Sequence, residues 1–143
     1  MTTMTVNEIP LARRVGRAQG DIDRGAMLKG NYMLVPSGRN VLAYKLEAVE
    51  QAACCPDAKA GNPCRHALAL QLLRGVKVHF GNEALKKLAE AEEAVVKAGG
   101  WQAAPQDLRL QAGQLAAEAA GVPFVNFGEL PRGQGRRRVV VVA

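Results

Sequence analysis

Aromatic residues are few in this sequence, and long apolar runs are absent. Aromatics make up 4% of the 143 residues, whereas 48% are hydrophobic and 22% are charged. These proportions are typical of a globular chain rather than a disordered one, with a thin core in which alanine is common. The longest purely apolar run, residues 139–143, is far shorter than the roughly 20 residues that cross a bilayer. We therefore expect no membrane-spanning segment.

Cysteine is also scarce. The chain has three cysteines, an odd number, and its first residues do not form the basic, apolar and small-residue pattern of a secretory signal. Free thiols of this kind persist in reducing compartments, where they remain available to bind metal. We expect a cytoplasmic protein.

Recognisable catalytic motifs are missing as well. The sequence contains no His-Glu-x-x-His, no His-x-Glu combined with Pro-Cys-x-x-Cys, and no glycine-rich phosphate loop of known pattern. Its one pair of adjacent cysteines differs from the Cys-x-x-Cys of redox enzymes. We predict a protein that is not an enzyme, and we infer no small-molecule substrate.

What the chain does have is a cluster of metal-ligand residues. Cys54 and Cys55 are adjacent, and a loop with one glycine and two prolines separates them from the pair Cys64 and His66. Thiolate and imidazole donors on two short segments are the ligands that Zn²⁺ prefers. The cluster therefore predicts a zinc site. The alternative is that the cysteines are small buried core residues without a metal.

Hydrophobic periodicity predicts the elements of the first half. The first six residues show no period and are expected to be frayed, with order beginning near Pro10. Apolar spacing predicts a basic helix over 11–22, and β-prone runs predict a hairpin of strands 32–37 and 41–47. A helix is predicted over 64–73, which places His66 in its first turn, and a short strand over 76–80.

The second half reads as a helical pair followed by strands. Asn82 is a favourable N-cap for a helix over 82–98, and Pro105 for the start of one over 105–120. Strand-like segments at 124–127 and 136–142 predict a closing hairpin. We expect an α+β fold with a zinc-stapled finger module over 1–80. Residues 81–143 are expected to form an Ala-rich helical pair and basic hairpin packed on that module.

The run around the cysteines resembles a SWIM-type zinc finger. Cys55-Pro56-Asp57 and Pro63-Cys64-Arg65-His66 match the order of the signature of that family, and the resemblance covers roughly residues 12–75. It implies a ββα unit in which a Cys-x-Cys at the end of a hairpin and a Cys-x-His at a helix start hold one zinc. It also implies binding to DNA or to protein partners.

The sequence departs from that family at the first ligand. With Cys55 aligned to the second cysteine of the signature, Ala53 occupies the first position and Cys54 the spacer. Neighbouring residues of a strand point to opposite sides, so Cys54 joins Cys55 on one ion only if the backbone bulges or leaves the strand. The fourth ligand is thus Cys54, or His79, or water. Asp57 is a weaker candidate.

Charge leaves two functions open. The net charge is +6, and basic residues outnumber acidic ones before residue 80 and after residue 123. We predict a zinc-binding, non-catalytic accessory module that binds DNA by contacting backbone phosphates through arginines. The alternative is a protein-interaction adaptor that uses zinc only as a structural staple, with its helical pair docked on a partner. The candidate nucleic-acid-binding residues are Arg13, Arg14, Arg17, Arg39, Arg65, Arg74, Arg136, Arg137 and Arg138.

Overall fold

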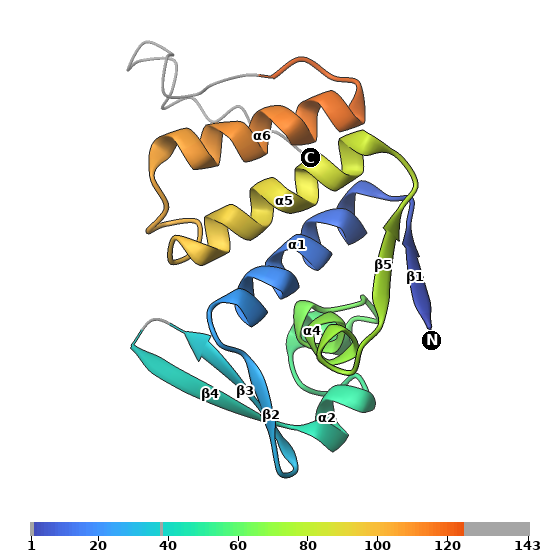
Figure 1. The fold of residues 1–143 in the computed structure, drawn as a ribbon, viewed down its shortest axis with the longest axis vertical. Coiled ribbons are helices and arrows are strands. Elements are labelled where there is room, and N and C mark those ends of the chain that lie inside the picture. The colour runs from blue at the N-terminus through green and yellow to red at the C-terminus, as the bar shows by residue number, and fades with distance from the viewer. Residues whose placement is uncertain (1, 38, 125–143) are drawn as a thin grey trace.

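The computed structural model describes residues 2–37 and 39–124, and it shows a mixture of helices and two small sheets (Figure 1). This confirms the expected α+β character. Within the described residues, no helix has the length and apolar character needed to cross a membrane. The predicted closing hairpin over 124–127 and 136–142 lies outside the described residues, apart from Phe124.

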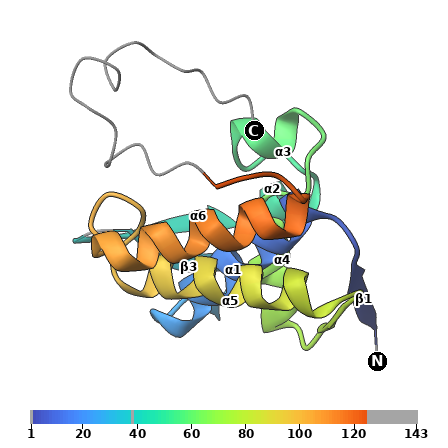
Figure 2. The ribbon, with the colours of Figure 1, turned by 90° about the horizontal axis from the view of Figure 1, so that it is seen from above.

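Three long helices form a stack at one end of the molecule. Helix α5 (Glu83–Lys97) packs against α1 (Ile9–Asp23) on one side and against α6 (Gln106–Ala120) on the other, as Figures 1 and 2 both show. The predicted Asn82 cap is confirmed, since its side chain accepts a hydrogen bond from the Leu85 amide at 3.0 Å. The helix predicted over 105–120 begins one residue later than expected.

The three-stranded sheet lies at the opposite end and contains the expected hairpin. Strands β3 (Tyr32–Ser37) and β4 (Asn40–Lys45) pair antiparallel, and β3 also pairs with β2 (Met27–Lys29), giving the order β2-β3-β4. The sequence analysis missed β2. A strand of three residues carries too little periodicity to be recognised without its partner.

The expectation of a frayed start is wrong. Residues Thr3–Val6 form strand β1, which pairs parallel with β5 (Lys77–Phe80). Val6 is fully buried, and its carbonyl accepts a hydrogen bond from the Gly81 amide at 2.8 Å. The strand depends on a partner more than 70 residues away, so four residues of local sequence could not indicate it.

A short helix replaces the end of the second predicted strand. Strand β4 ends at Lys45, and α2 (Leu46–Glu50) follows, so the prediction of a strand to residue 47 is wrong. Leu, Glu and Ala are good helix formers, and the chain turns after α2 at Ala52, which has a positive φ of 56°. The metal-ligand loop therefore starts from a helix and not from a hairpin end.

The segments that flank the loop are also helical. Helix α3 (Pro56–Lys59) begins directly after Cys55, and α4 (Arg65–Leu73) begins directly after Cys64, close to the predicted start. The main core joins α1, the sheets and α4, while a smaller cluster joins α5 to α6. Many of the buried residues in the described part of the chain are alanines, and none is aromatic, as the composition indicated.

Helix α1 approaches α5 so closely that glycine is required at the crossing. A Cβ atom added at Gly16 would collide with the backbone carbonyl of Ala89, and one added at Gly20 would collide with the side chain of Val96. Backbone atoms of a packed helix cannot move aside as a flexible side chain can. The α1–α5 contact therefore depends on these two glycines.

We predict that Gly16→Ala lowers the free energy of unfolding by about 2 kcal/mol or more, because the new methyl group overpacks this crossing. Urea denaturation followed by circular dichroism measures the change. Gly113→Ala is the matched control: it lies within α6, and its new methyl group meets the Phe124 ring, which has rotatable bonds. Equal effects of the two substitutions would contradict the account of the crossing.

Candidate metal site

The four predicted ligand residues converge in space. One ligand atom from each of Cys54, Cys55, Cys64 and His66 lies within 4.8 Å of all the others. The Cys54 Sγ is 3.8 Å from the Cys55 Sγ, 3.7 Å from the Cys64 Sγ and 4.0 Å from the His66 Nδ1. Such a cluster of soft donors could hold one metal ion.

The path of the backbone explains how two adjacent cysteines reach the same point. Cys54 lies in the loop between α2 and α3, and Cys55 is the N-cap of α3, in extended conformation. Because neither residue belongs to a strand, the alternation that would separate their side chains does not apply. Cys54 is therefore available as the fourth donor of the cluster. His79 lies outside the cluster, on β5 opposite Thr5.

The start of α4 positions the other two donors. Cys64 is its N-cap and only 2% exposed, and its Sγ accepts a hydrogen bond from the Ala67 amide at 3.3 Å. Two residues on, the His66 ring lies 4.2 Å from the Tyr44 ring, measured between centroids, at an interplanar angle of 32°. Tyr44 comes from β4, so the sheet supplies an aromatic contact to the imidazole.

The surroundings change the proton affinity of these donors. Burial, followed by the positive charge of Arg65, lowers the pKa of His66 and so favours the neutral imidazole that binds metals. Burial and the neighbouring thiols Cys64 and Cys55 raise the pKa of Cys54 to about 12. Burial also acts to raise the pKa of Cys55, but hydrogen bonds, chiefly from the Ala58 amide, lower it overall. Three ionised thiols this close would repel one another unless a cation lay between them.

An ion pair between half-exposed Arg65 and buried Asp21 ties the Cys-x-His segment to α1. Arg65 donates to both carboxylate oxygens of Asp21, at 2.8 Å from Nε to Oδ2 and 2.6 Å from Nη2 to Oδ1. Asp21 is 1% exposed. Bidentate pairs of this kind have a defined geometry, so the pair fixes the residue that stands between Cys64 and His66. The sequence analysis missed both Asp21 and Tyr44, whose contacts come from remote elements.

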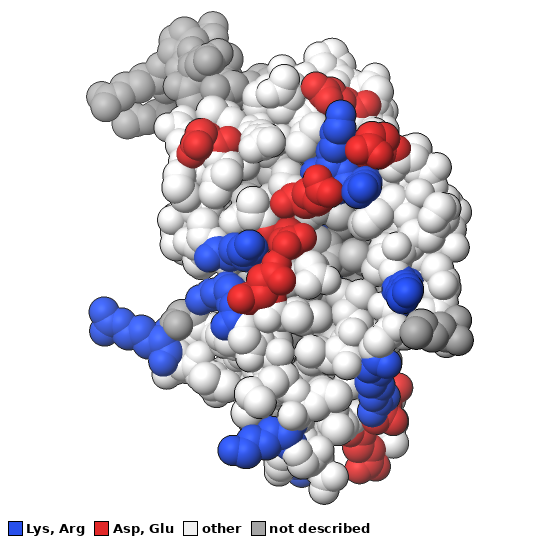
Figure 3. Space-filling model, viewed as in Figure 1, with Lys and Arg blue, Asp and Glu red and all other residues white. Residues whose placement is uncertain are grey.

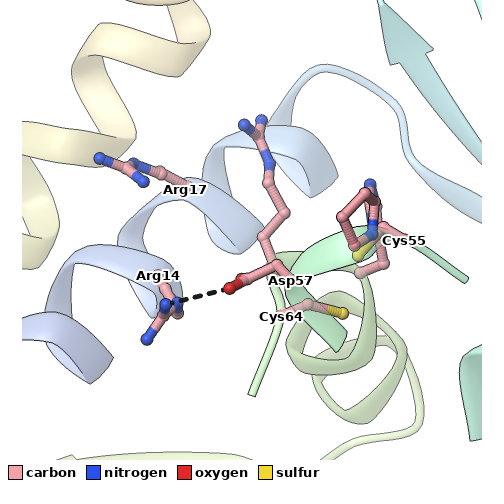
Figure 4. A pocket seen from close by; sticks show the side chains of 8 residues that line it. Arg14, Arg17, Cys55, Asp57 and Cys64 are labelled. Carbon is pink, nitrogen blue, oxygen red and sulfur yellow. Dashed lines mark hydrogen bonds and ion pairs between the residues drawn. The ribbon is translucent and has the colours of Figure 1, made fainter. Parts of the chain in front are cut away.

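A cleft opens beside the cluster. It has a volume of about 510 Å³, and in Figure 4 Arg14 and Arg17 of α1 lie on one side, with Cys55 and Cys64 on the other. Arg65 and His66 also line it. Arg14 donates to the Asp57 carboxylate at 3.3 Å, the contact that the dashed line marks. Asp57 is engaged there and is not part of the metal cluster.

The structure gathers only part of the predicted nucleic-acid-binding set. Arg13 and Arg17 both pair with the buried carboxylate of Glu92, at 2.8 and 3.3 Å, and Arg74 pairs with Glu50 at 2.9 Å. Figure 3 shows acidic and basic side chains mixed along a diagonal band. Arg39 lies on the exposed turn of the hairpin, away from the cleft lining. Arg136, Arg137 and Arg138 lie outside the described residues.

Comparison with known proteins does not assign the chain to a family. No family model, no curated protein and no solved structure matches the chain.

The Asp21–Arg65 pair should stabilise the site more than an exposed pair does. We predict that Asp21→Asn lowers the free energy of unfolding by about 2 kcal/mol, because one of the two oxygens that accept from Arg65 becomes an NH₂ group, and this donor then faces the guanidinium donors. It should also weaken metal binding by about tenfold or more, since outer contacts orient metal ligands. Urea denaturation and competition with a chromogenic chelator measure the two effects.

The control is Glu50→Gln, which breaks the exposed pair between Glu50 and Arg74. Exposed pairs contribute less than about 1 kcal/mol, and neither Glu50 nor Arg74 belongs to the metal cluster. The account fails if Asp21→Asn behaves like this control in both assays.

Proposed function

We propose that the chain is a zinc-binding, non-catalytic interaction module of the SWIM-like kind, in which one Zn²⁺ staples the loop after α2 to the start of α4. The main support for this proposal is the geometry of the Cys₃His cluster. With Zn–S bonds of about 2.3 Å, two sulfurs of a tetrahedral site stand about 3.8 Å apart. The Sγ separations of 3.7 and 3.8 Å in the cluster fit that spacing.

The donor set supports a structural metal rather than a catalytic one. A catalytic zinc keeps one position for water or substrate, whereas structural sites take four protein ligands. Here four protein donors are available to fill the tetrahedron. Thiol ligands also suit a reducing compartment such as the cytoplasm.

Zinc should be required for the local fold. We predict that the purified protein holds one equivalent of zinc by elemental analysis, and that Cys54→Ser, Cys55→Ser, Cys64→Ser and His66→Ala each lower its content or affinity. Because metal binding is coupled to folding, a strong chelator should also remove hydrogen-exchange protection from the β3–β4 hairpin.

His79→Ala is the matched control, because it removes the other histidine without touching the cluster. It should keep full zinc content. A protein that keeps its hairpin protection in strong chelator, or that purifies without metal under reducing conditions, would contradict the proposal.

A protein partner is the better supported target. Five of the six described candidate arginines already pair with carboxylates of the chain, so binding phosphates would mean breaking or sharing those contacts. The adaptor role is therefore the one that we propose.

DNA binding is the second candidate, and one specific observation favours it. Arg14, Arg17 and Arg65 line a single cleft beside the metal cluster, where a phosphate group of a nucleic-acid backbone would meet three guanidinium groups. This candidate would explain the net charge of +6 without involving the apolar surfaces of the molecule.

A salt series on labelled duplex DNA separates the two candidates. The adaptor role predicts weak binding that Arg14→Gln with Arg17→Gln changes no more than the control pair Lys86→Gln with Lys87→Gln on exposed α5 positions. Affinity that falls steeply with salt, and that is lost only in the cleft variant, would establish the DNA role instead.

A further inference from the structure

The outward face of the three-stranded sheet carries apolar side chains where a solvent-facing sheet carries polar ones. The inward face of β3 holds Met33 and Val35, both buried in the core. The positions between them point outward and are Tyr32, Leu34 and Pro36. An antiparallel sheet with one face in water alternates apolar and polar residues, and this one does not.

Strand register extends the apolar surface across all three strands. Residues directly opposite each other share a face, so Met27 and Ala43 flank Leu34, and Val41 lies opposite Pro36. Met27 is 50% exposed, Tyr32 42% and Val41 62%. We call this surface the sheet face, defined by Met27, Tyr32, Leu34, Pro36, Val41 and Ala43. Contiguous apolar surface of this kind on a folded chain marks an interaction site.

The sheet face has a hollow and basic ends. A hollow of about 410 Å³ lies over Tyr32, Leu34 and Ala43. The register places Lys29 and Lys45 on either side of Tyr32, and Arg39 lies at the hairpin turn beyond Val41. None of these three basic residues forms an ion pair with another residue of the described part. In contrast, Arg13, Arg14 and Arg17 of α1 and Arg65 of α4 each pair with a carboxylate.

The sheet packs on α1 but lies away from the other two helices of the stack. Figure 1 shows it at the end of the molecule away from α5 and α6. In the same view, Figure 3 shows basic side chains and uncharged surface in that region, while acidic side chains gather along the diagonal band and at the opposite lower edge. The basic residues that the strand register places beside the sheet face are Lys29 and Lys45, with Arg39 at the turn.

We infer that the sheet face binds an acidic amphipathic helix of a partner protein. Apolar area needs an apolar stripe to cover it, and a helix lying on a sheet is a common way to do so. The unpaired Lys29, Lys45 and Arg39 select carboxylates beside that stripe. The six-residue strands β3 and β4 span roughly 20 Å, which a helix of about 13 residues matches. The inference rests on the proposed adaptor function and names its partner.

Two other occupants fit the surface less well. Single-stranded nucleic acid stacks its bases on aromatic rings, and the sheet face offers only Tyr32 among aliphatic residues. A second copy of the chain would bring the same lysines and arginine against one another, which like charge opposes.

The test uses zinc-loaded full-length protein and a fluorescein-labelled 14-residue peptide. The peptide has leucines at i, i+3, i+4, i+7 and i+11 and glutamates at most other positions. We expect binding with a Kd of about 100 µM or tighter by fluorescence anisotropy. The same peptide with lysines in place of glutamates should bind at least about tenfold more weakly.

Variants of the sheet face locate the binding. Met27→Ser with Val41→Ser, and separately Lys29→Glu with Lys45→Glu, should each weaken binding at least about tenfold. Val122→Ser, at a valine that is 55% exposed outside the sheet, and Lys86→Glu with Lys87→Glu on α5 are the matched controls and should bind as the wild type does.

Several results would overturn the inference. These are no binding of the acidic peptide, equal loss in the control variants, preferential binding of a single-stranded oligonucleotide at the sheet face, or a dimer in sedimentation that Val41→Ser disrupts. Zinc content is measured on every sample. If zinc-loaded protein does not bind the peptide, only the inference about the sheet face is refuted. If the purified protein holds no zinc, the metal proposal itself is refuted.

Discussion

The bidentate contact between Asp21 and Arg65 joins the helical stack to the Cys₃His cluster, and it sets the position of one relative to the other. Asp21 sits near the end of α1, and the glycine crossing holds α1 against α5. Arg65 stands between Cys64 and His66 in the sequence. Because Asp21 orients the Arg65 guanidinium, it also helps to position the helix start that carries these two donors. A carboxylate buried to 1% exposure without this partner would be costly. The pair therefore couples the fold of α1 to the position of the site.

The cluster itself shows how local structure determines what a motif can do. Adjacent cysteines on a strand would diverge, but α2 replaces the end of the hairpin and delivers Cys54 and Cys55 from a loop. The N-cap position of Cys64 and the ring of Tyr44 then hold the second pair. Cys54, which occupies the spacer position of the family signature, can thus join a set of four donors, which a straight strand would not allow.

Sequence reasoning identified what is locally encoded. The spacing of Cys64 and His66, the Asn82 cap and the apolar periods of α1, α5 and α6 all appear within a few residues of chain, and the structure has them. It missed β1, which exists through pairing with β5, and it missed Asp21 and Tyr44, whose roles depend on contacts from distant elements. The pairing of α1 arginines with Glu92 likewise needed the helix packing to be known.

X-ray absorption at the zinc edge of the purified, reduced protein tests the central claim most directly, because it reports the atoms bound to the metal. The account predicts three sulfur ligands at about 2.3 Å and one nitrogen ligand at about 2.0–2.1 Å. In Cys54→Ser the sulfur count should fall to two, whereas His79→Ala should leave the spectrum unchanged. A first shell made mainly of oxygen, or one that loses its nitrogen in His79→Ala, would contradict the account.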